Sequence, residues 1–158
     1  MVSFIKPYRQ DPFVGHLATP VTTSAFTRAY LKVLPAYRTG LTPIARGSEI
    51  GFTHGYFLVG PFYTYGPLRS LEFSLSSLAA GTLSAITLLL ILTIALSMYG
   101  QVKYEVSDNP LAAPNKTNET TQLNSASGWQ KFTEGFFSGG LIGTVVASVG
   151  IAVYSTYF

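Results

Sequence analysis

Two long stretches without a charged side chain constrain this sequence more than any other feature. Residues 73–101 and residues 135–158 contain no Asp, Glu, Lys or Arg. Each is longer than the ~18 apolar residues that mark a candidate transmembrane helix. Charged residues make up 11% of the chain, against about 25% in an average soluble domain. The chain is therefore expected to be an integral membrane protein.

The cysteine and histidine content excludes several classes of site. The chain has no cysteine, which excludes disulfide frameworks, cysteine zinc sites, iron–sulfur clusters and thiol catalysis. Its two histidines are His16 and His54. A haem held between two histidines would need both at membrane depth, and His16 lies far upstream of the apolar segments. No catalytic triad, phosphate loop or pair of carboxylates occurs at membrane depth, so we expect no enzymatic activity.

The fold class predicted from these patterns is an all-α membrane protein. It has three transmembrane helices and a short amphipathic surface helix, Ala25–Leu34, that Ser24 can cap. This surface helix is expected to lie on a membrane or on a protein surface. We treat residues 1–158 as a single membrane domain, made of an N-terminal segment at 1–42, helices at 43–65, 75–99 and 128–153, and a polar loop at 101–127.

The ends of the three long helices follow from capping residues. Thr42 with Pro43 predicts a helix start, and Gly66 with a following proline predicts its stop. Gly100 is expected to cap the second helix at its C-terminus. The spacing of Ser127–Gln130 is that of a capping box at the start of the third helix. Aromatic residues at the ends of that helix predict interfacial anchors: Trp129, Tyr154, Tyr157 and Phe158.

The distribution of Lys and Arg predicts the orientation in the membrane. Three spans place nine of these residues on one side and only Arg69 on the other. The positive-inside rule then puts the N-terminus on the cytoplasmic side or its organellar equivalent. The formal net charge of +3 follows from this asymmetry and requires no nucleic-acid partner.

Small residues repeat every four positions in the first and third helices. Such faces let two helix backbones approach closely in lipid, and they also admit a flat ring system. Packing within the chain and contact with another subunit both remain open at this stage. The residues are Gly47, Gly51 and Gly55 in the first helix, and Gly135, Gly139, Gly143 and Ala147 in the third.

Glu49 and His54 are the candidate ligands. Ionisable groups within membrane helices are costly and indicate function. Five residues correspond to about 140° of rotation and ~7.5 Å of rise on a helix, so the two side chains face different flanks and are poorly placed to chelate one ion together. Each could supply one ligand to a separate centre: imidazole for a metal in a planar macrocycle, and carboxylate for a hard ion such as magnesium. The alternatives are an ion pair of Glu49 with Arg46 and an interhelical hydrogen bond of His54.

Several sequence blocks, in order along nearly the whole chain, match one known family. They are Asp11–Pro20, Leu34–Arg38, Arg46–Gly51, His54–Phe62, Gly66–Arg69 and Gly128–Phe137. On these blocks the chain closely resembles photosystem I reaction-centre subunit XI, the L subunit. The resemblance implies a non-catalytic subunit of the thylakoid membrane, in an algal plastid or a cyanobacterium, with its N-terminus in the stroma or cytoplasm.

The resemblance also implies cofactors and partners. The family binds chlorophyll a and β-carotene or a related carotenoid, and its magnesium-ligating glutamate and histidine fall on Glu49 and His54. The implied partners are other photosystem I core subunits, peripheral light-harvesting antenna and lipid. Because the sequence ends soon after the third helix, we expect a monomeric complex with antenna rather than a trimer. The alternative from the residues alone is a homo-oligomeric channel or transporter packed through the glycine face of the third helix.

Overall fold

The computed structural model describes residues 5–8, 11–17, 21, 24–66, 68–69, 73–104, 123 and 125–157. Contacts divide the chain into two compact units, Met1–Thr39 and Gly40–Phe158, where the sequence suggested a single domain. Each unit is taken by itself below. Phe158 and most of the polar segment expected at 101–127 lie outside the described residues.

The first unit contains a β-hairpin that the sequence analysis did not anticipate. Strands β1 (Ile5–Tyr8) and β2 (Asp11–Leu17) pair antiparallel, with Ile5 opposite Leu17 and Lys6 opposite His16. The register shifts between Pro7 and Tyr8. Proline lacks an N–H donor, so an irregular two-stranded ribbon is a permitted place for it. His16 therefore belongs to a strand, outside the helical unit.

Helix α2 (Ala25–Val33) is the amphipathic surface helix expected from the sequence. The Ser24 side chain accepts a hydrogen bond from the Thr27 amide at 3.0 Å, as an N-cap residue does. The helix ends one residue earlier than predicted because Leu34 is extended, as the residue before a proline usually is. No residue of α2 is buried, and Phe26, Tyr30 and Val33 expose apolar surface.

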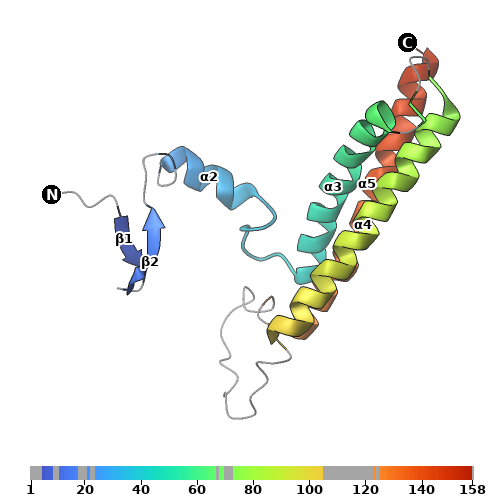
Figure 1. Ribbon diagram of the computed structural model, residues 1–158. Coiled ribbons are helices and arrows are strands. Elements are labelled where there is room, and N and C mark those ends of the chain that lie inside the picture. Colours follow the sequence, from blue (N-terminus) through green and yellow to red (C-terminus); the bar gives the residue numbers. More distant parts are fainter. Residues whose placement is uncertain are drawn as a thin grey trace. The chain divides into compact units, whose positions relative to one another are not determined.

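In the second unit every described element is a helix, and the three helices lie side by side (Figure 1). They are α3 (Pro43–Tyr65), α4 (Leu75–Tyr104) and α5 (Ala126–Tyr157). Helix α3 has Thr42 as its N-cap and Gly66 as its C-cap, the two residues that the sequence indicated. Pro61 lies inside α3 and removes one intrahelical hydrogen bond, the one to the Phe57 carbonyl.

Helix α4 does not end at Gly100, so the predicted C-cap is wrong. The helix continues to Tyr104, and Gly100 is buried within it. A Cβ atom at Gly100 would lie 2.5 Å from the Cβ atom of Trp129 on α5. Glycine is required here because two helices approach closely, not because the chain turns.

The capping prediction for α5 is also wrong by two residues. The helix begins at Ala126, and the Ser125 hydroxyl accepts from the Gly128 amide at 3.1 Å, so Ser125 takes the role expected of Ser127. At its other end α5 runs to Tyr157, four residues beyond the predicted end. The Trp129 ring packs edge-on against Tyr99 at 5.0 Å and Phe132 at 5.3 Å. Trp129 is thus a packing residue between helices rather than an outward anchor.

Facing residues give the direction of each helix. Positions 47, 51 and 55 of α3 meet positions 132, 136 and 140 of α5, so α3 and α5 run parallel. Helix α4 runs antiparallel to both, because Gly81 meets Tyr63 and Gly100 meets Trp129. Thr82 on α4 and Ser148 on α5 share a hydrogen bond of 2.7 Å. Leu89 of α4 is fully buried against Gly140 and forms the centre of the core with Phe132 and Phe136.

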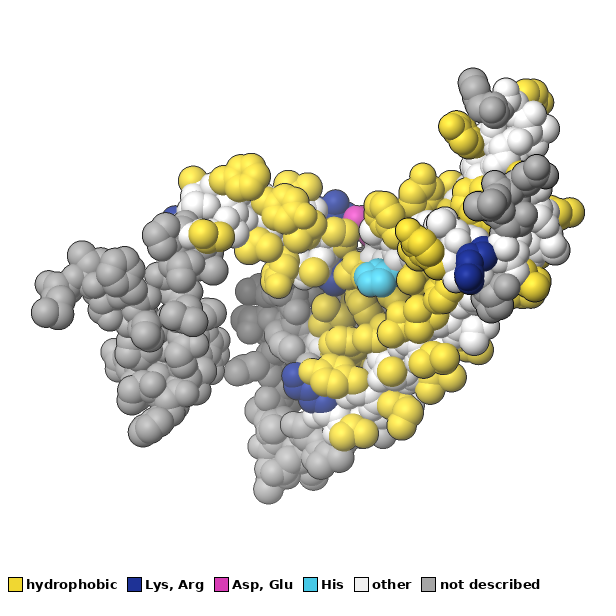
Figure 2. Space-filling model, turned by 45° about the horizontal axis from the view of Figure 1, so that its top comes forward, with side chains coloured by type: hydrophobic (Ala, Val, Ile, Leu, Met, Phe, Trp, Pro, Cys, Tyr) yellow, Lys and Arg dark blue, Asp and Glu magenta, His cyan; other side chains and the backbone are white. Residues whose placement is uncertain are grey.

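Two of these helices meet the length and hydropathy requirements of a membrane span. Leu75–Lys103 has a mean hydropathy of 2.2 and Ala126–Tyr157 one of 1.9 over their most apolar windows. Apolar side chains cover much of the outer surface of the helical unit (Figure 2). Helix α3 does not meet the same requirement, so the count of three spans stays a prediction. Arg46, Glu49 and His54 lower its hydropathy.

Candidate functional site

The glycine faces of α3 and α5 lie against each other and form one seam. A Cβ atom at Gly51 would overlap the carbonyl oxygen of Phe136, and one at Gly139 would overlap that of Ser48. The same holds for each of the other seam glycines against a backbone carbonyl of the facing helix: Gly47, Gly55, Gly135 and Gly143. The face of the third helix is therefore filled from within the chain.

The seam has a simple physical basis. A glycine whose missing Cβ would overlap a carbonyl oxygen presents a Cα–H bond to that oxygen instead. Such Cα–H···O contacts contribute roughly 0.5–1 kcal/mol each at helix–helix interfaces. In lipid the hydrophobic effect does not drive helices together, because the lipid tails are as apolar as the helix surface. Small residues drive helix association there by allowing this kind of close approach. The channel alternative required this face for contact with a second copy, and α3 already covers it.

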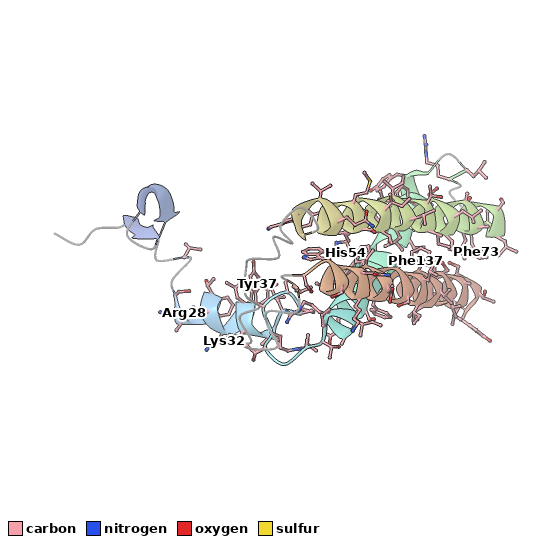
Figure 3. All side chains as sticks on the ribbon, turned by 90° about the horizontal axis from the view of Figure 1, so that it is seen from below. Arg28, Lys32, Tyr37, His54, Phe73 and Phe137 are labelled. Carbon is pink, nitrogen blue, oxygen red and sulfur yellow. The ribbon has the colours of Figure 1, made fainter. Side chains whose placement is uncertain are left out.

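His54 lies beside this seam on α3 (Figure 3). Its Nδ1 atom lies 2.8 Å from the Ile50 carbonyl oxygen, and its ring meets Phe136 of α5 edge-on at 5.5 Å. A carbonyl accepts only, so the proton sits on Nδ1 and the lone pair on Nε2. Among the described residues Nε2 has no hydrogen-bond partner, and the side chain is exposed. The structure thus gives His54 an intrahelical bond in place of the interhelical bond considered from sequence.

Glu49 occupies a different side of the same helix. It lies about 200° from Gly51 around the α3 axis, on the face away from α5. The side chain is half-buried, and its backbone carbonyl accepts the Thr53 hydroxyl at 3.0 Å. Arg46, one turn earlier, is buried at 5% exposure next to Gly47. The structure therefore separates Glu49 from His54, as their spacing predicted.

No group of three or more His, Asp or Glu side chains converges on a common point within the described residues. A centre that needs three or four protein ligands has no place among them. A metal in a macrocycle needs only one axial ligand from the protein, since the ring supplies the others. The exposed imidazole nitrogen of His54 suits such a centre, and so does a carboxylate oxygen of Glu49.

A second feature is a groove between the C-terminal halves of α3 and α5. It has a volume of about 770 Å³. Aromatic side chains line it, together with Gly60 and Pro61 of α3 and Gly150 of α5. The sequence analysis missed this groove, because neither glycine belongs to the four-residue repeats. The feature of the sequence that could have indicated the groove is a glycine outside the four-residue repeat on each helix, Gly60 on α3 and Gly150 on α5.

Comparison with known proteins decides the family. The model of the photosystem I reaction centre subunit XI family matches residues 4–155. The chain belongs to that family. The subunit XI of Trieres chinensis is 51% identical over 139 residues, which are 88% of this chain and 86% of that one. That of Cyanidioschyzon merolae is 44% identical over 155 residues, 98% and 100% of the two chains.

A third relative, the subunit XI of Trichodesmium erythraeum, is 49% identical over 144 residues, covering 91% of this chain and 83% of its own length. The resemblance found in the sequence is thereby confirmed across nearly the whole chain. Membership makes this chain a subunit of photosystem I, in company with the other core subunits of that complex. A photosystem I subunit with two strongly apolar helices resides in the thylakoid membrane.

Proposed function

We propose that this chain is a non-catalytic, pigment-binding subunit of photosystem I. In this proposal His54 and Glu49 each ligate the magnesium of one chlorophyll a, and the apolar helix surfaces hold β-carotene or a related carotenoid. A chlorophyll held at either residue would supply light absorption and transfer of excitation energy to the core. The chain's own residues would ligate the magnesium and orient the ring.

The observation that carries the proposal is the state of His54. The Ile50 carbonyl holds the Nδ1 proton and fixes the ring orientation, as the outer hydrogen bond of a metal-ligating histidine does. The lone pair on Nε2 then points away from the backbone of α3. The Phe136 ring packs against the imidazole in an edge-to-face arrangement and restricts its rotation. These two contacts leave one nitrogen prepared to ligate.

The proposal includes α3 as the third membrane span, with the N-terminus on the stromal side. Its 23 residues extend about 34 Å at ~1.5 Å per residue, enough for the ~30 Å hydrocarbon core. Its glycines follow α5, a strongly apolar helix, over several turns. A helix packed in this way along a membrane span occupies the same depth. Its polar groups are then at membrane depth, where ionisable residues mark functional sites.

Site-directed variants test the ligand assignment in the intact complex. We expect His54→Leu and Glu49→Leu each to remove one chlorophyll per photosystem I while the subunit still assembles. The measurement is the chlorophyll content and absorption spectrum of the isolated complex, normalised to the amount of its reaction centres. Leucine fills the space of either side chain and offers no ligand atom.

The matched control is Thr53→Val on the same turn of α3. Thr53 is exposed, and within the described part of the chain its hydroxyl donates to the Glu49 carbonyl alone, so this variant should keep every pigment. Unchanged chlorophyll in both leucine variants would overturn the ligand assignment. Loss of the same pigment in Thr53→Val would mean that packing, not ligation, holds the chlorophyll.

A further inference from the structure

The groove between α3 and α5 has a floor of glycine that the fold itself does not require. A Cβ atom at Gly60 or Gly150 would meet nothing within 4 Å. The seam glycines of the same two helices would all overlap backbone atoms of the facing helix. Packing between helices therefore explains why the seam positions are glycine. It does not explain why positions 60 and 150 are glycine, because a side chain there would meet no other part of the described chain. Their effect is to keep the groove open.

Two hydroxyl groups in the groove also differ from their neighbours. Most Ser and Thr residues in these helices donate to the carbonyl four residues earlier, as Thr156 does to Ala152 at 2.7 Å. Thr64 of α3 and Ser155 of α5 both line the groove, and neither forms a hydrogen bond with any described residue. Both belong to the part of the lining nearest the C-terminal ends of α3 and α5, one residue and two residues before the ends of their helices.

The rest of the lining is uncharged and largely apolar. None of the lining residues is Asp, Glu, Lys, Arg or His. Tyr65 and Tyr157 are exposed at the C-terminal ends of the same two helices, and exposed tyrosines at helix ends are typical of a membrane–water interface. The hydroxyl end of the groove is thus at the level of the headgroups, and the glycine floor lies deeper in the hydrocarbon.

We propose that this groove binds one membrane lipid with an uncharged, hydroxyl-bearing headgroup. An acyl chain lies over Gly60 and Gly150, and the headgroup hydroxyls bond to Thr64 and Ser155. An anionic headgroup would find no cation among the lining residues. The inference rests on the proposed membrane insertion of α3.

The size of the groove favours a lipid over a protein helix. A volume of about 770 Å³ lies within the ~300–1,000 Å³ typical of small-molecule sites. A transmembrane helix, ~10 Å wide and ~30 Å long, occupies on the order of 2,000 Å³. The groove also extends over only the C-terminal halves of α3 and α5, which is too short for a full span.

The first test fills the groove without disturbing the seam. In photosystem I isolated from cells carrying Gly60→Leu with Gly150→Leu, we expect one fewer neutral glycolipid per complex by quantitative mass spectrometry. The control is Val149→Leu, which enlarges an exposed α5 residue outside the groove. Pigments are counted in the same samples, so loss of lipid with full chlorophyll separates this site from the one at His54 and Glu49.

The second test keeps the shape of the groove and removes its hydrogen bonding. Complexes stripped of lipid by detergent are incubated with dioleoyl glucosylglycerol or with anionic dioleoylphosphatidylglycerol. Thr64→Val with Ser155→Ala should lower retention of the glucolipid about tenfold and leave the anionic lipid unaffected. An unchanged glucolipid content in both double variants would overturn the proposal. So would release of a protein subunit or a pigment instead of lipid from the leucine variant.

Discussion

Helix α5 has two neighbours, and it holds them in different ways. Its contact with α3 is made by backbone, since glycines on each helix lie directly over carbonyl groups of the other. Its contact with α4 is made mainly by side chains, with Leu89 fully buried between Gly140 and the rings of Phe132 and Phe136. Thr82 and Ser148 add one hydrogen bond between α4 and α5.

The difference teaches how rigidly each helix is placed. A backbone contact cannot adjust to a larger residue, because no side chain can rotate out of the way. A side-chain contact can repack around small changes in volume, with losses that follow the size of the change. Helix α3 carries both candidate ligands, so the rigid contact fixes the position of the helix that the proposed ligation depends on.

The largest effect is expected where a side chain enters the seam. A Cβ atom at Gly51 would overlap the Phe136 backbone, so Gly51→Leu should separate α3 from α5. We expect at least about tenfold less subunit in isolated photosystem I, from the overpacking penalty. Immunoblots of complexes normalised to reaction centres measure this. Gly60→Leu adds the same side chain to α3 where space is open, and should accumulate normally; equal amounts of both variants would contradict the seam.

A smaller effect is expected on the α4 side. Leu89→Ala removes a fully buried side chain and should destabilise the packing of α4 by about 2–5 kcal/mol. The subunit should then leave the complex at a lower temperature, measured by native electrophoresis after stepwise heating in mild detergent. Leu90→Ala, on the neighbouring exposed position, is the control. If the Leu90 variant lowered the release temperature as much, burial by α5 would not be the cause.

The smallest effect is expected from the bond between Thr82 and Ser148. Interhelical hydrogen bonds in membrane proteins contribute about 0.6 kcal/mol on average. Thr82→Val and Ser148→Ala should each lower the release temperature slightly. Because both variants remove the same hydrogen bond, the double variant should lose less than the sum of the two single losses. A double-mutant cycle on the same heating assay measures the coupling. Fully additive losses would show that the two hydroxyls do not depend on each other.

Much of the helical unit follows from local sequence. Thr42 and Gly66 define both ends of α3 because a capping hydroxyl and a terminal glycine act within one turn of the helix. The same reasoning failed at Gly100 and Ser127. Both fit a cap pattern, yet α4 continues past Gly100, and Ser125 takes the cap of α5. The sequence does not distinguish a glycine that ends a helix from one that, like Gly100, makes room for Trp129 of another helix.

The candidate ligands divide in a similar way. The sequence alone placed Glu49 and His54 on different sides of one helix, because the angle between them depends only on helix geometry. It left open whether His54 bonds across to another helix. In the structure His54 bonds within its own helix: its Nδ1 atom lies 2.8 Å from the Ile50 carbonyl oxygen. The backbone of α3 places that carbonyl, and the Phe136 ring packs against the imidazole.

By itself the sequence predicted a helical membrane protein and placed the two candidate ligands on different sides of one helix, because these properties depend on residue type and on spacing along the helix. Its resemblance to the photosystem I subunit XI family rested on ordered blocks along nearly the whole chain, and the family comparison confirmed it. Only the tertiary structure decided which glycines form the seam and which open the groove. Both kinds are the same residue in the same helices, and they differ only in whether another backbone lies within reach of the missing Cβ atom.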